Sequence, residues 1–474
     1  MSETIEADLC VIGAGSAGLS VAAGASQMGA PTVLVEAGVM GGDCLNEGCV
    51  PSKSLLAAAH VGHVIRHGAR FGVDGHEPEV DFARVHAHVH EVIESIAPID
   101  SQERFEGLGV RVIRARAAFV SKDEVRAGEA SIRARRFVIA TGSRPAVPPI
   151  PGLAGVPFHT NETIFDNRTA PSHLIVIGGG PIGCEMAQAH RRLGVEVTVL
   201  DLGPILPKDD PELVAVVRRQ LEAEGVALLE RIRVEGVEPA GNGVAVSVRA
   251  DGATRRIEGS DLLIATGRAP NVENMGLEAA GIEHDASGIK VDRRLRTSNR
   301  RAFAIGDVVG GHQFTHVGSY HAGIVIRNAL FRLPARVHYG ALPWVTYTDP
   351  ELAQVGLTEA QAREQGRAVE VLRWPFVDND RARTERATEG LIKVVATRRG
   401  RVLGASIAGA RAGELILPWV LAIGSGLKLG AIANAIVPYP TRSEVSKRAA
   451  GAFYTPRLFS GRTRWLVRQL ARLG

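Results

Sequence analysis

Two cysteines lie five residues apart in the segment GGDCLNEGCVPSK, residues 41–53. The spacing of Cys44 and Cys49, with Gly48 between them and Pro51 after, suits a redox-active disulfide across one distorted helical turn. Lys53 follows Cys49 by four residues, about one helical turn, so its charge is placed to stabilise a thiolate. A metal centre would need more ligands at matched spacing. A pair of unreactive core thiols is the remaining alternative.

A strand, a glycine-rich turn, a helix and a second strand occur in this order twice, at residues 5–36 and 173–201. In such a unit the first glycine permits a tight turn, the second lets the backbone approach a pyrophosphate, and the third allows close packing of the helix. The helix N-terminus offers N–H groups to the phosphates, and an acidic residue after the second strand accepts from ribose hydroxyls. A glycine turn without a ligand is the alternative. The predicted nucleotide-binding residues are Gly13, Gly15, Gly18 and Glu36 in the first copy and Gly178, Gly180, Gly183 and Asp201 in the second.

Asp201 also bears on the choice of nicotinamide. Its negative charge opposes a 2′-phosphate, and no arginine stands at position 202 or 203 to offset it. The second site is therefore predicted to prefer NADH to NADPH. Lys208 or a more distant arginine would weaken this preference.

The repeat suggests how the 474 residues divide, at roughly 150 residues per domain. We expect one nucleotide-binding domain from residues 1–150 with 271–341, and a second, inserted one from residues 151–270. From residue 342 the glycine motifs stop, and strands at 391–408 followed by a helix at 411–427 predict a separate α+β domain to residue 455. A tail covers residues 456–474.

Composition excludes several classes of protein. Hydrophobic residues at 45% and charged residues at 22% exclude a disordered chain, and 54 glycines without a G-X-Y period exclude collagen. Four cysteines in a chain this long do not form a disulfide scaffold, and a net charge of +4 does not indicate nucleic acid. The acidic start MSETIEADL is not typical of a secretory signal, and the nearly uncharged residues 415–437 predict a buried helix and loop. We expect a cytoplasmic protein.

Six motifs, in order, carry a resemblance to a known family: GAGSAG, GGDCLNEGCVPSK, ATGSRP, GGGPIGCE, ATGRAPN and AFAIGDV. The chain resembles the pyridine nucleotide–disulfide oxidoreductases, which include dihydrolipoamide dehydrogenase, glutathione reductase and mercuric reductase, over about residues 5–455. The resemblance implies an α/β fold with two Rossmann-like domains, one for FAD and one for NAD(P)H, and a C-terminal α+β dimerisation domain in a homodimer.

The resemblance also implies roles for single residues. Hydride passes from NAD(P)H to FAD, which reduces the Cys44–Cys49 disulfide; Cys49 matches the thiol that faces the flavin, and Cys44 the interchange thiol that attacks the substrate. Lys53 matches a lysine near flavin N5, and Glu185 the glutamate that pairs with it. The further predicted cofactor contacts are Gly42, Thr141, Gly142 and Gly267, with Asp307 on the ribityl chain.

One motif departs from the family. Disulfide reductases carry a His-Pro near the C-terminus, and that histidine, from the other subunit, is the general acid/base for the interchange thiol. Here residues 438–444 are PYPTRSE, so Tyr439 takes the place of the histidine while Glu444 keeps its own. A phenol with a pKa of ~10 is a poor proton shuttle at pH 7, where histidine titrates near ~6.5.

Mercuric reductases resemble this chain in having a tyrosine there, although the C-terminal cysteine pair that they carry is absent from the tail RQLARLG. The leading hypothesis is a mercuric reductase-like enzyme with a metal-ion, disulfide or other small-molecule acceptor. The alternatives are a dihydrolipoamide dehydrogenase with an altered base, and an electron-transfer or redox-sensing flavoprotein for a membrane or protein partner.

The other cysteines, Glu47, the histidines and the tail lie outside these motifs. Cys10 and Cys184 are expected in the core, and Glu47, between the reactive cysteines, either raises a thiol pKa or faces solvent. His60, His63 and His67 share a helical face from which a metal site could be built, whereas His86, His88 and His90 are spaced by two. Exposed helix histidines are the plainer interpretation, and no metal site is predicted. The tail has five arginines and no acid. With its apolar side chains it suits an anionic membrane surface, its own subunit or a partner subunit.

Overall fold

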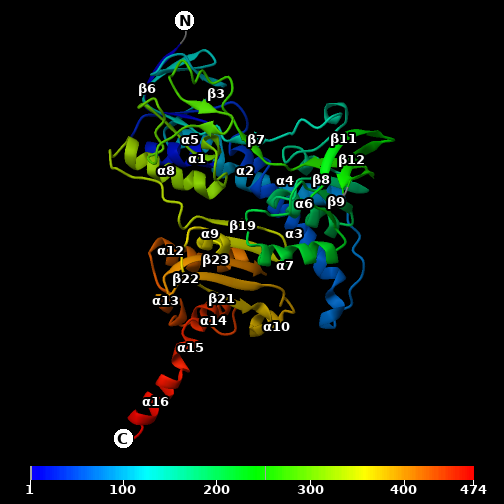
Figure 1. Ribbon diagram of the computed structural model, residues 1–474. Coiled ribbons are helices and arrows are strands. Elements are labelled where there is room, and N and C mark those ends of the chain that lie inside the picture. The colour runs from blue at the N-terminus through cyan, green and yellow to red at the C-terminus, as the bar shows by residue number, and fades with distance from the viewer. Residues whose placement is uncertain (1–2, 251, 474) are drawn as a thin grey trace. The chain divides into compact units, whose positions relative to one another are not determined.

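The computed structural model describes residues 3–250 and 252–473, which form two compact units. The first unit contains the chain up to Gly178, residues 189–200 and residues 233–337. The second contains residues 179–188, 201–232 and the chain from His338 onward. Figure 1 shows the course of the chain through its elements. The mixed α/β class predicted from the sequence is confirmed.

A largely parallel sheet forms the centre of the first unit. Strand β1 (Thr4–Ile12) lies between β2 (Thr32–Glu36) and β6 (Ala130–Ile139), and β3 (Val110–Arg114) extends the sheet beyond β2. Strand β18 (Ala302–Ala304) returns late in the chain to pair with β6 in parallel. Buried apolar residues alternate with exposed ones only at the start of β1, because both faces of its C-terminal half are covered.

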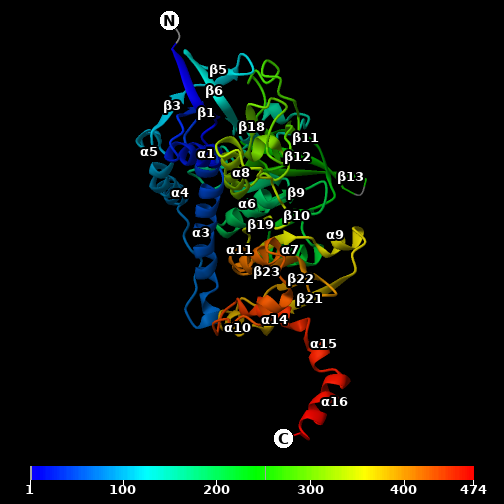
Figure 2. The ribbon, with the colours of Figure 1, turned by 90° about the vertical axis from the view of Figure 1, so that its left-hand side faces the viewer.

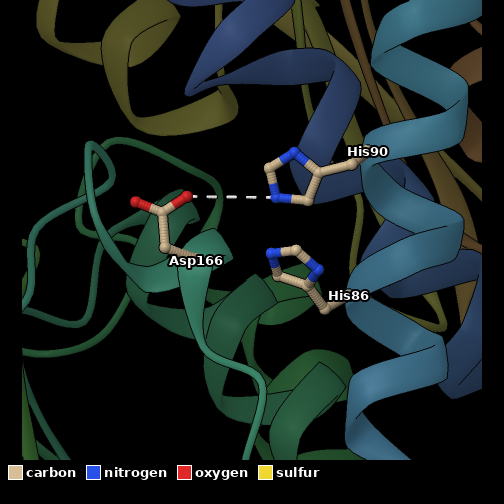
Figure 3. A group of neighbouring side chains, drawn as sticks. All are labelled: His86, His90 and Asp166. Carbon is tan, nitrogen blue, oxygen red and sulfur yellow. Dashed lines mark ion pairs between the residues drawn. The ribbon is translucent and has the colours of Figure 1, made fainter.

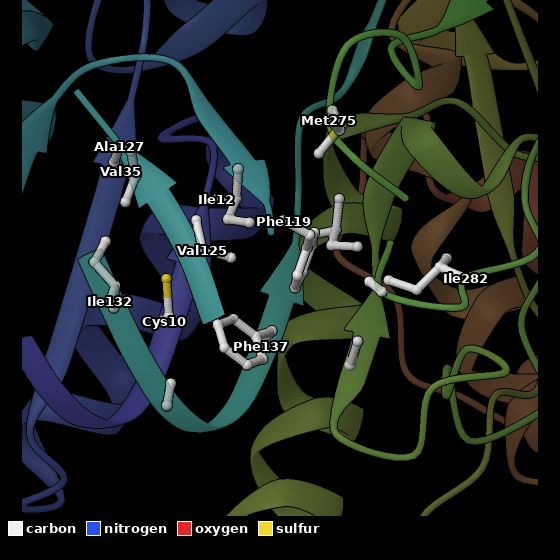
Figure 4. Packing of buried hydrophobic residues seen from close by; sticks show 14 of the residues in the cluster. Cys10, Ile12, Val35, Phe119, Val125, Ala127, Ile132, Phe137, Met275 and Ile282 are labelled. Atoms are coloured by element: carbon white, nitrogen blue, oxygen red, sulfur yellow. The ribbon is translucent and has the colours of Figure 1, made fainter. Parts of the chain in front are cut away.

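Helices cover this sheet, and a core lies beneath them. Helix α1 (Ser16–Gln27) packs against α8 (Thr315–Ala329), as Figure 2 shows. Figure 4 shows Cys10 among Val125, Ile132 and Phe137, all fully buried. Cys10 is therefore a core residue, as expected from the sequence.

The two strands of the second glycine motif and a third strand from later in the chain also belong to the first unit. Strand β8 (His173–Ile177) pairs in parallel with β9 (Glu196–Leu200) and with β14 (Asp261–Ile264). Helix α6 (Pro181–Arg192) follows β8 after the glycine turn. The strand–turn–helix–strand order predicted at both motifs is confirmed, while the predicted domain boundaries remain predictions.

The second unit holds an antiparallel sheet in the order β19 (Pro343–Thr346), β20 (Glu351–Gly356), β23 (Val402–Gly409), β22 (Leu391–Thr397) and β21 (Val369–Pro375). The strands predicted at 391–408 are β22 and β23. The helix predicted at 411–427 is instead two helices, α11 (Ala412–Leu415) and α12 (Leu417–Gly424). Pro418 begins the second one, because proline lacks the N–H that a continuous helix requires there.

A buried lysine connects several elements of the second unit. Lys393 on β22 is only 6% exposed, and its Nζ lies 2.8 Å from Asp210, 3.0 Å from Glu212 and 2.9 Å from Glu359. Asp210 caps α7 (Pro211–Ala223), and Glu359 begins α9 (Glu359–Glu364). The three carboxylates satisfy a charge that would otherwise be costly to bury.

Within the described ranges, no helix combines the length and the apolar character that crossing a membrane requires.

Candidate active site

Cys44 and Cys49 lie on two successive helices. Cys44 is in the short helix α2 (Gly42–Asn46), and Cys49 is the first residue of α3 (Cys49–Arg66). The single distorted turn expected from the spacing is thus a break between helices. Gly48 makes the break possible, because a Cβ there would come within 2.9 Å of the Asp43 backbone oxygen.

The two sulfur atoms meet at the hydroxyl of Thr315. Thr315 Oγ1 lies 3.1 Å from Cys44 Sγ and 3.4 Å from Cys49 Sγ. Thr315 begins α8, far from the cysteines in sequence. Sequence reasoning missed it, because no local motif marks a lone threonine at a helix start.

The dithiol carries its negative charge on Cys49. The pKa of Cys49 is lowered to about 6, chiefly by a hydrogen bond from the Cys44 thiol. A hydrogen bond with Thr315 and the charge of Lys53 act in the same direction. The hydrogen bond between the two cysteines, together with burial, raises the pKa of Cys44 far above its ordinary range. Near pH 7 the reduced pair is therefore a Cys49 thiolate that accepts a hydrogen bond from a protonated Cys44.

Asp43, rather than Glu47, is the carboxylate that opposes this thiolate. The charge of Asp43 raises the pKa of both cysteines, whereas burial raises the pKa of Glu47 itself. Asp43 Oδ1 accepts a hydrogen bond of 2.8 Å from Asn161 and lies 3.0 Å from Arg268 Nη2. Arg268 partly neutralises Asp43 and Asn161 donates a hydrogen bond to it, and the sequence analysis had not identified either residue.

Arg268 is also connected, through Ser143, to the predicted cofactor residue Asp307. It donates to Ser143 Oγ at 2.7 Å, and Ser143 donates to Asp307 Oδ2 at 2.6 Å. Burial raises the pKa of Asp307. Thr141 donates to the backbone oxygen of Asn271 at 2.9 Å, so these side chains tie the segments ATGSRP, ATGRAPN and AIGDV together within the first unit.

Glu36 holds the first glycine turn from both sides. Its Oε2 accepts from the backbone N–H of Ala14 at 2.5 Å, and its Oε1 accepts from that of Gly38 at 2.6 Å. Gly13, which directly precedes Ala14, has a φ of +105°, which an L-residue rarely adopts. A Cβ at Gly15 would meet no atom within 4 Å, so the backbone at the start of α1 has the open space that a pyrophosphate requires. These residues fit the adenosine diphosphate half of FAD.

Asp201 repeats this arrangement in the second motif. Its Oδ2 accepts from Gly179 at 2.5 Å and its Oδ1 from Gly203 at 2.7 Å. Gly178 has a φ of +116°, and a Cβ at Gly180 would again meet nothing within 4 Å. Each carboxylate keeps free lone pairs for a ribose hydroxyl, so the second site fits a pyridine dinucleotide.

The other predicted positions show the same openness around the first motif. Gly142 and Gly267 have φ values of +68° and +133°, and a Cβ at either would meet nothing within 4 Å. Gly42, with a φ of +61°, lies against the backbone of Gly15. In the second motif, Gly183 lies buried in α6 and the buried Cys184 donates to the Gly179 oxygen at 3.4 Å, so Cys184 is a core residue as expected.

Two family models match the chain. The model of the pyridine nucleotide-disulphide oxidoreductases matches residues 7–322, and the model of their dimerisation domain matches residues 342–450. This chain belongs to that family. It is a flavoprotein disulfide reductase of the mercuric reductase and lipoamide dehydrogenase class, it depends on FAD and a pyridine nucleotide, and its dimerisation domain supports a homodimer.

Relatives of two activities are equally similar to this family member. It is 36% identical to a mercuric reductase of Bacillus cereus over 449 residues, which covers 94% of this chain and 71% of that one. It is 35% identical to a dihydrolipoyl dehydrogenase of Geobacillus stearothermophilus over 459 residues, 94% and 96% of the two chains. The copper(II) complex of the HOCl-induced flavoprotein disulfide reductase RclA of Escherichia coli superimposes with a TM-score of 0.83 at 28% identity, covering 93% of this chain and 98% of that one.

The dimerisation domain of this family member holds the tyrosine that replaces the expected histidine. Tyr439 is 70% exposed, and its hydroxyl donates to Asp380 Oδ2 at 3.2 Å. This hydrogen bond and the charge of Asp380 raise the pKa of the phenol. Tyr439 therefore stays protonated at neutral pH and is not a base.

Glu444 and Glu185 lie in the same unit. Glu444 begins α14 (Glu444–Ala452), and Glu185, only 4% exposed, accepts from the backbone N–H of Tyr347 at 2.9 Å. The structure thus places Cys44, Cys49 and Lys53 in the first unit, and Glu185, Tyr439 and Glu444 in the second. The predicted pairing of Glu185 with Lys53 remains a prediction.

Proposed function

We propose that this enzyme uses NADH to reduce a thiol-reactive soft metal ion of the Hg(II) type at Cys44 and Cys49. The observation that carries the proposal is Tyr439 in the place of the expected histidine, with its hydroxyl donating to Asp380, while the pKa of Cys44 is raised by the hydrogen bond to Cys49 and by burial. A disulfide substrate requires a base of suitable pKa to activate Cys44. A soft cation does not, because metal binding to a thiol itself displaces the proton.

The reaction balances as NADH and Hg(II) giving NAD⁺, H⁺ and Hg(0), with the two hydride electrons ending on the metal. FAD, when bound, supplies the two-electron relay between the nicotinamide and the cysteines. The Cys49 thiolate and Cys44 bind the ion, and Cys44 releases its proton to water. Tyr439 of the partner subunit supplies a neutral phenol beside the interchange thiol in this proposal.

The acceptor can be tested directly. Enzyme reduced anaerobically with NADH is mixed with Hg(II), lipoamide, glutathione disulfide or a quinone, and its reoxidation is followed. We expect Hg(II) to reoxidise it fastest and to form volatile mercury. Faster reoxidation by lipoamide would support a dihydrolipoamide dehydrogenase instead, and reoxidation by quinones alone would support an electron-transfer flavoprotein.

Tyr439 provides a second, independent test. Tyr439→His should raise lipoamide turnover, since a positioned general acid/base contributes ~10²–10⁴-fold. Tyr439→Phe is the matched control, because it removes the hydroxyl without supplying a base, and lipoamide turnover should not rise. If wild-type enzyme already reduces lipoamide as fast as Tyr439→His, the tyrosine is no handicap and the argument for a metal acceptor fails.

We also propose that NADH is the preferred reductant. Asp201 supports this because its charge opposes a 2′-phosphate. Arg231 is a cation that the sequence analysis did not weigh: its backbone N–H donates to the Gly203 oxygen at 3.3 Å, and Gly203 lies two residues after Asp201. The ratio of kcat/KM for NADH to that for NADPH should be at least ~10, equivalent to ~1.4 kcal/mol.

Two variants separate these charges. Asp201→Arg should shift the ratio toward NADPH, and Arg231→Ala should shift it further toward NADH. Equal efficiency with both nucleotides in wild-type enzyme would contradict the proposal.

A second candidate function concerns the tail, for which we propose contact with an anionic membrane surface. Helix α16 (Gly461–Leu470) has exposed Leu466, Val467 and Leu470 on one side and Arg464 and Arg468 on another, and Figure 1 shows it extending from the end of the second unit. The exposed Trp465 falls beside the arginines rather than with these apolar side chains. Full-length enzyme should sediment with vesicles containing phosphatidylglycerol, whereas enzyme without residues 456–474 should not. Equal sedimentation, or none, would contradict this proposal.

We propose a cytoplasmic location, because that compartment keeps protein thiols reduced.

A further inference from the structure

Two histidines on α4 (Phe82–Ile96) and an aspartate from a neighbouring segment face one another in the first unit. His86 and His90 are four residues apart and share one helical face, which the sequence analysis overlooked by treating them with His88 as a set spaced by two. Their ring centroids are 4.0 Å apart. Asp166, the last residue of the short helix η4 (Ile164–Asp166), places Oδ1 3.9 Å from His90 Nε2. Figure 3 shows both imidazoles beside the Asp166 carboxylate.

The Nε2 atom of His90 is left without an ordinary partner. It is shielded from solvent and has no hydrogen bond to any residue in the described ranges. Its distance of 3.9 Å from Asp166 is too long for a hydrogen bond. Buried polar nitrogens are almost always bonded, so this one requires an explanation.

We propose that His86, His90 and Asp166 bind a divalent first-row transition-metal ion, with Zn²⁺ as the probe. Their ligand atoms all lie within 4.8 Å of one another. A tetrahedral zinc ion with ligand bonds of about 2.0 Å needs separations of about 3.3 Å, so a modest contraction closes the site. Two imidazoles and one carboxylate favour zinc, copper or nickel over magnesium or calcium, and the fourth position is left for water.

Such an ion would connect α4 to the segment that supports the redox cysteines. Helix α4 packs against α3, which begins with Cys49. Five residues before Asp166, Asn161 donates to Asp43 and to the Glu47 oxygen. The ion is thus a resident structural ion, held by nitrogen and oxygen, and is chemically distinct from a soft ion held by the two sulfurs.

Equilibrium dialysis of the FAD-loaded enzyme against Zn²⁺, followed by elemental analysis, tests the proposal. The enzyme carries no histidine tag, and Cys44 and Cys49 are kept as a disulfide so that they do not bind zinc. We expect one zinc ion per subunit. His86→Ala and His90→Ala should each weaken binding at least ~10-fold, and Asp166→Asn should also weaken it. His88→Ala, on the same helix but off this face, is the matched control and should bind as wild type does.

Two outcomes would overturn the site. In the first, wild-type enzyme binds no more zinc than the His86→Ala, His90→Ala double variant. In the second, His88→Ala loses as much binding as either single variant. Flavin content and melting temperature show whether each variant is folded, and His86→Asn and His90→Asn replace any alanine variant that is not. Activity toward Hg(II) is not part of the test, so its result is independent of the proposed acceptor.

Discussion

Removing the hydroxyl of Thr315 should make the Cys49 thiolate harder to form. When Cys49 is ionised, the hydroxyl donates its one hydrogen to the negative sulfur, 3.4 Å away. A hydrogen bond to a charged group is worth ~1.5–3 kcal/mol. Because sulfur is a weak acceptor and the distance is long, we take the lower end of this range. One pKa unit corresponds to ~1.4 kcal/mol, so Thr315→Val should raise the pKa of Cys49 by about one unit.

The sign of the pH dependence follows from the lowered pKa. In wild-type enzyme the thiolate should be present above about pH 6 and be lost as the pH falls through that value. In Thr315→Val the same loss should be centred near pH 7. The pKa of Cys49 should not return fully to its ordinary value, since the Cys44 thiol, the largest cause of the lowered pKa, still donates to Cys49.

The assay is a pH titration of the two-electron-reduced holoenzyme under anaerobic conditions. We expect the thiolate of Cys49, which we propose faces the flavin, to give a long-wavelength absorbance that reports its ionisation. Thr315→Ser keeps the hydroxyl and should titrate like wild type. An unchanged midpoint in Thr315→Val, or an equal shift in Thr315→Ser, would refute the role assigned to the hydroxyl.

Three further outcomes are expected. In the reduced enzyme, Cys49→Ser should abolish the long-wavelength band, and Cys44→Ser should make it permanent; a Cys44→Ser protein without the band would mean that the two thiol roles are reversed. Lys393→Met should lower the free energy of unfolding by ~3–5 kcal/mol, measured by urea denaturation, because it removes the cation that faces the buried Asp210 carboxylate, whereas the exposed Arg363→Met should cost at most ~1 kcal/mol; equal costs would contradict the importance of burial. Gly180→Ala should raise KM for NADH without lowering the melting temperature, since its Cβ fills only the space left for phosphate; an unchanged KM would place the nucleotide elsewhere.

The sequence predicted most of what depends on local order. The glycine turns need a strand before and a helix after them, and an acid eighteen residues later, so each site could be read from about thirty consecutive residues. Glu36 and Asp201 accept hydrogen bonds from backbone N–H groups at equivalent positions of the two motifs, which is why the same local pattern occurs twice.

The parts that the sequence could not supply come from distant segments. Thr315 reaches the two cysteines from the start of α8, and Arg268 reaches Asp43 from the motif ATGRAPN. Neither residue has a spacing that distinguishes it from other threonines and arginines. The pair His86 and His90 was in principle visible, since a spacing of four places side chains on one helical face. Its third member, Asp166, is brought close only by the fold.

The carboxylate of Glu36 has a consequence for how a cofactor enters. It accepts hydrogen bonds from the N–H groups of Ala14 and Gly38, and Asp201 accepts them from Gly179 and Gly203 in its own turn. A loop that must be ordered on binding reduces affinity by ~0.5–1.5 kcal/mol for each side chain immobilised. Hydrogen bonds within the protein fix the backbone of each turn, so little of this cost should arise when a nucleotide binds. Each turn has its own acidic residue, so the two nucleotide sites are organised separately.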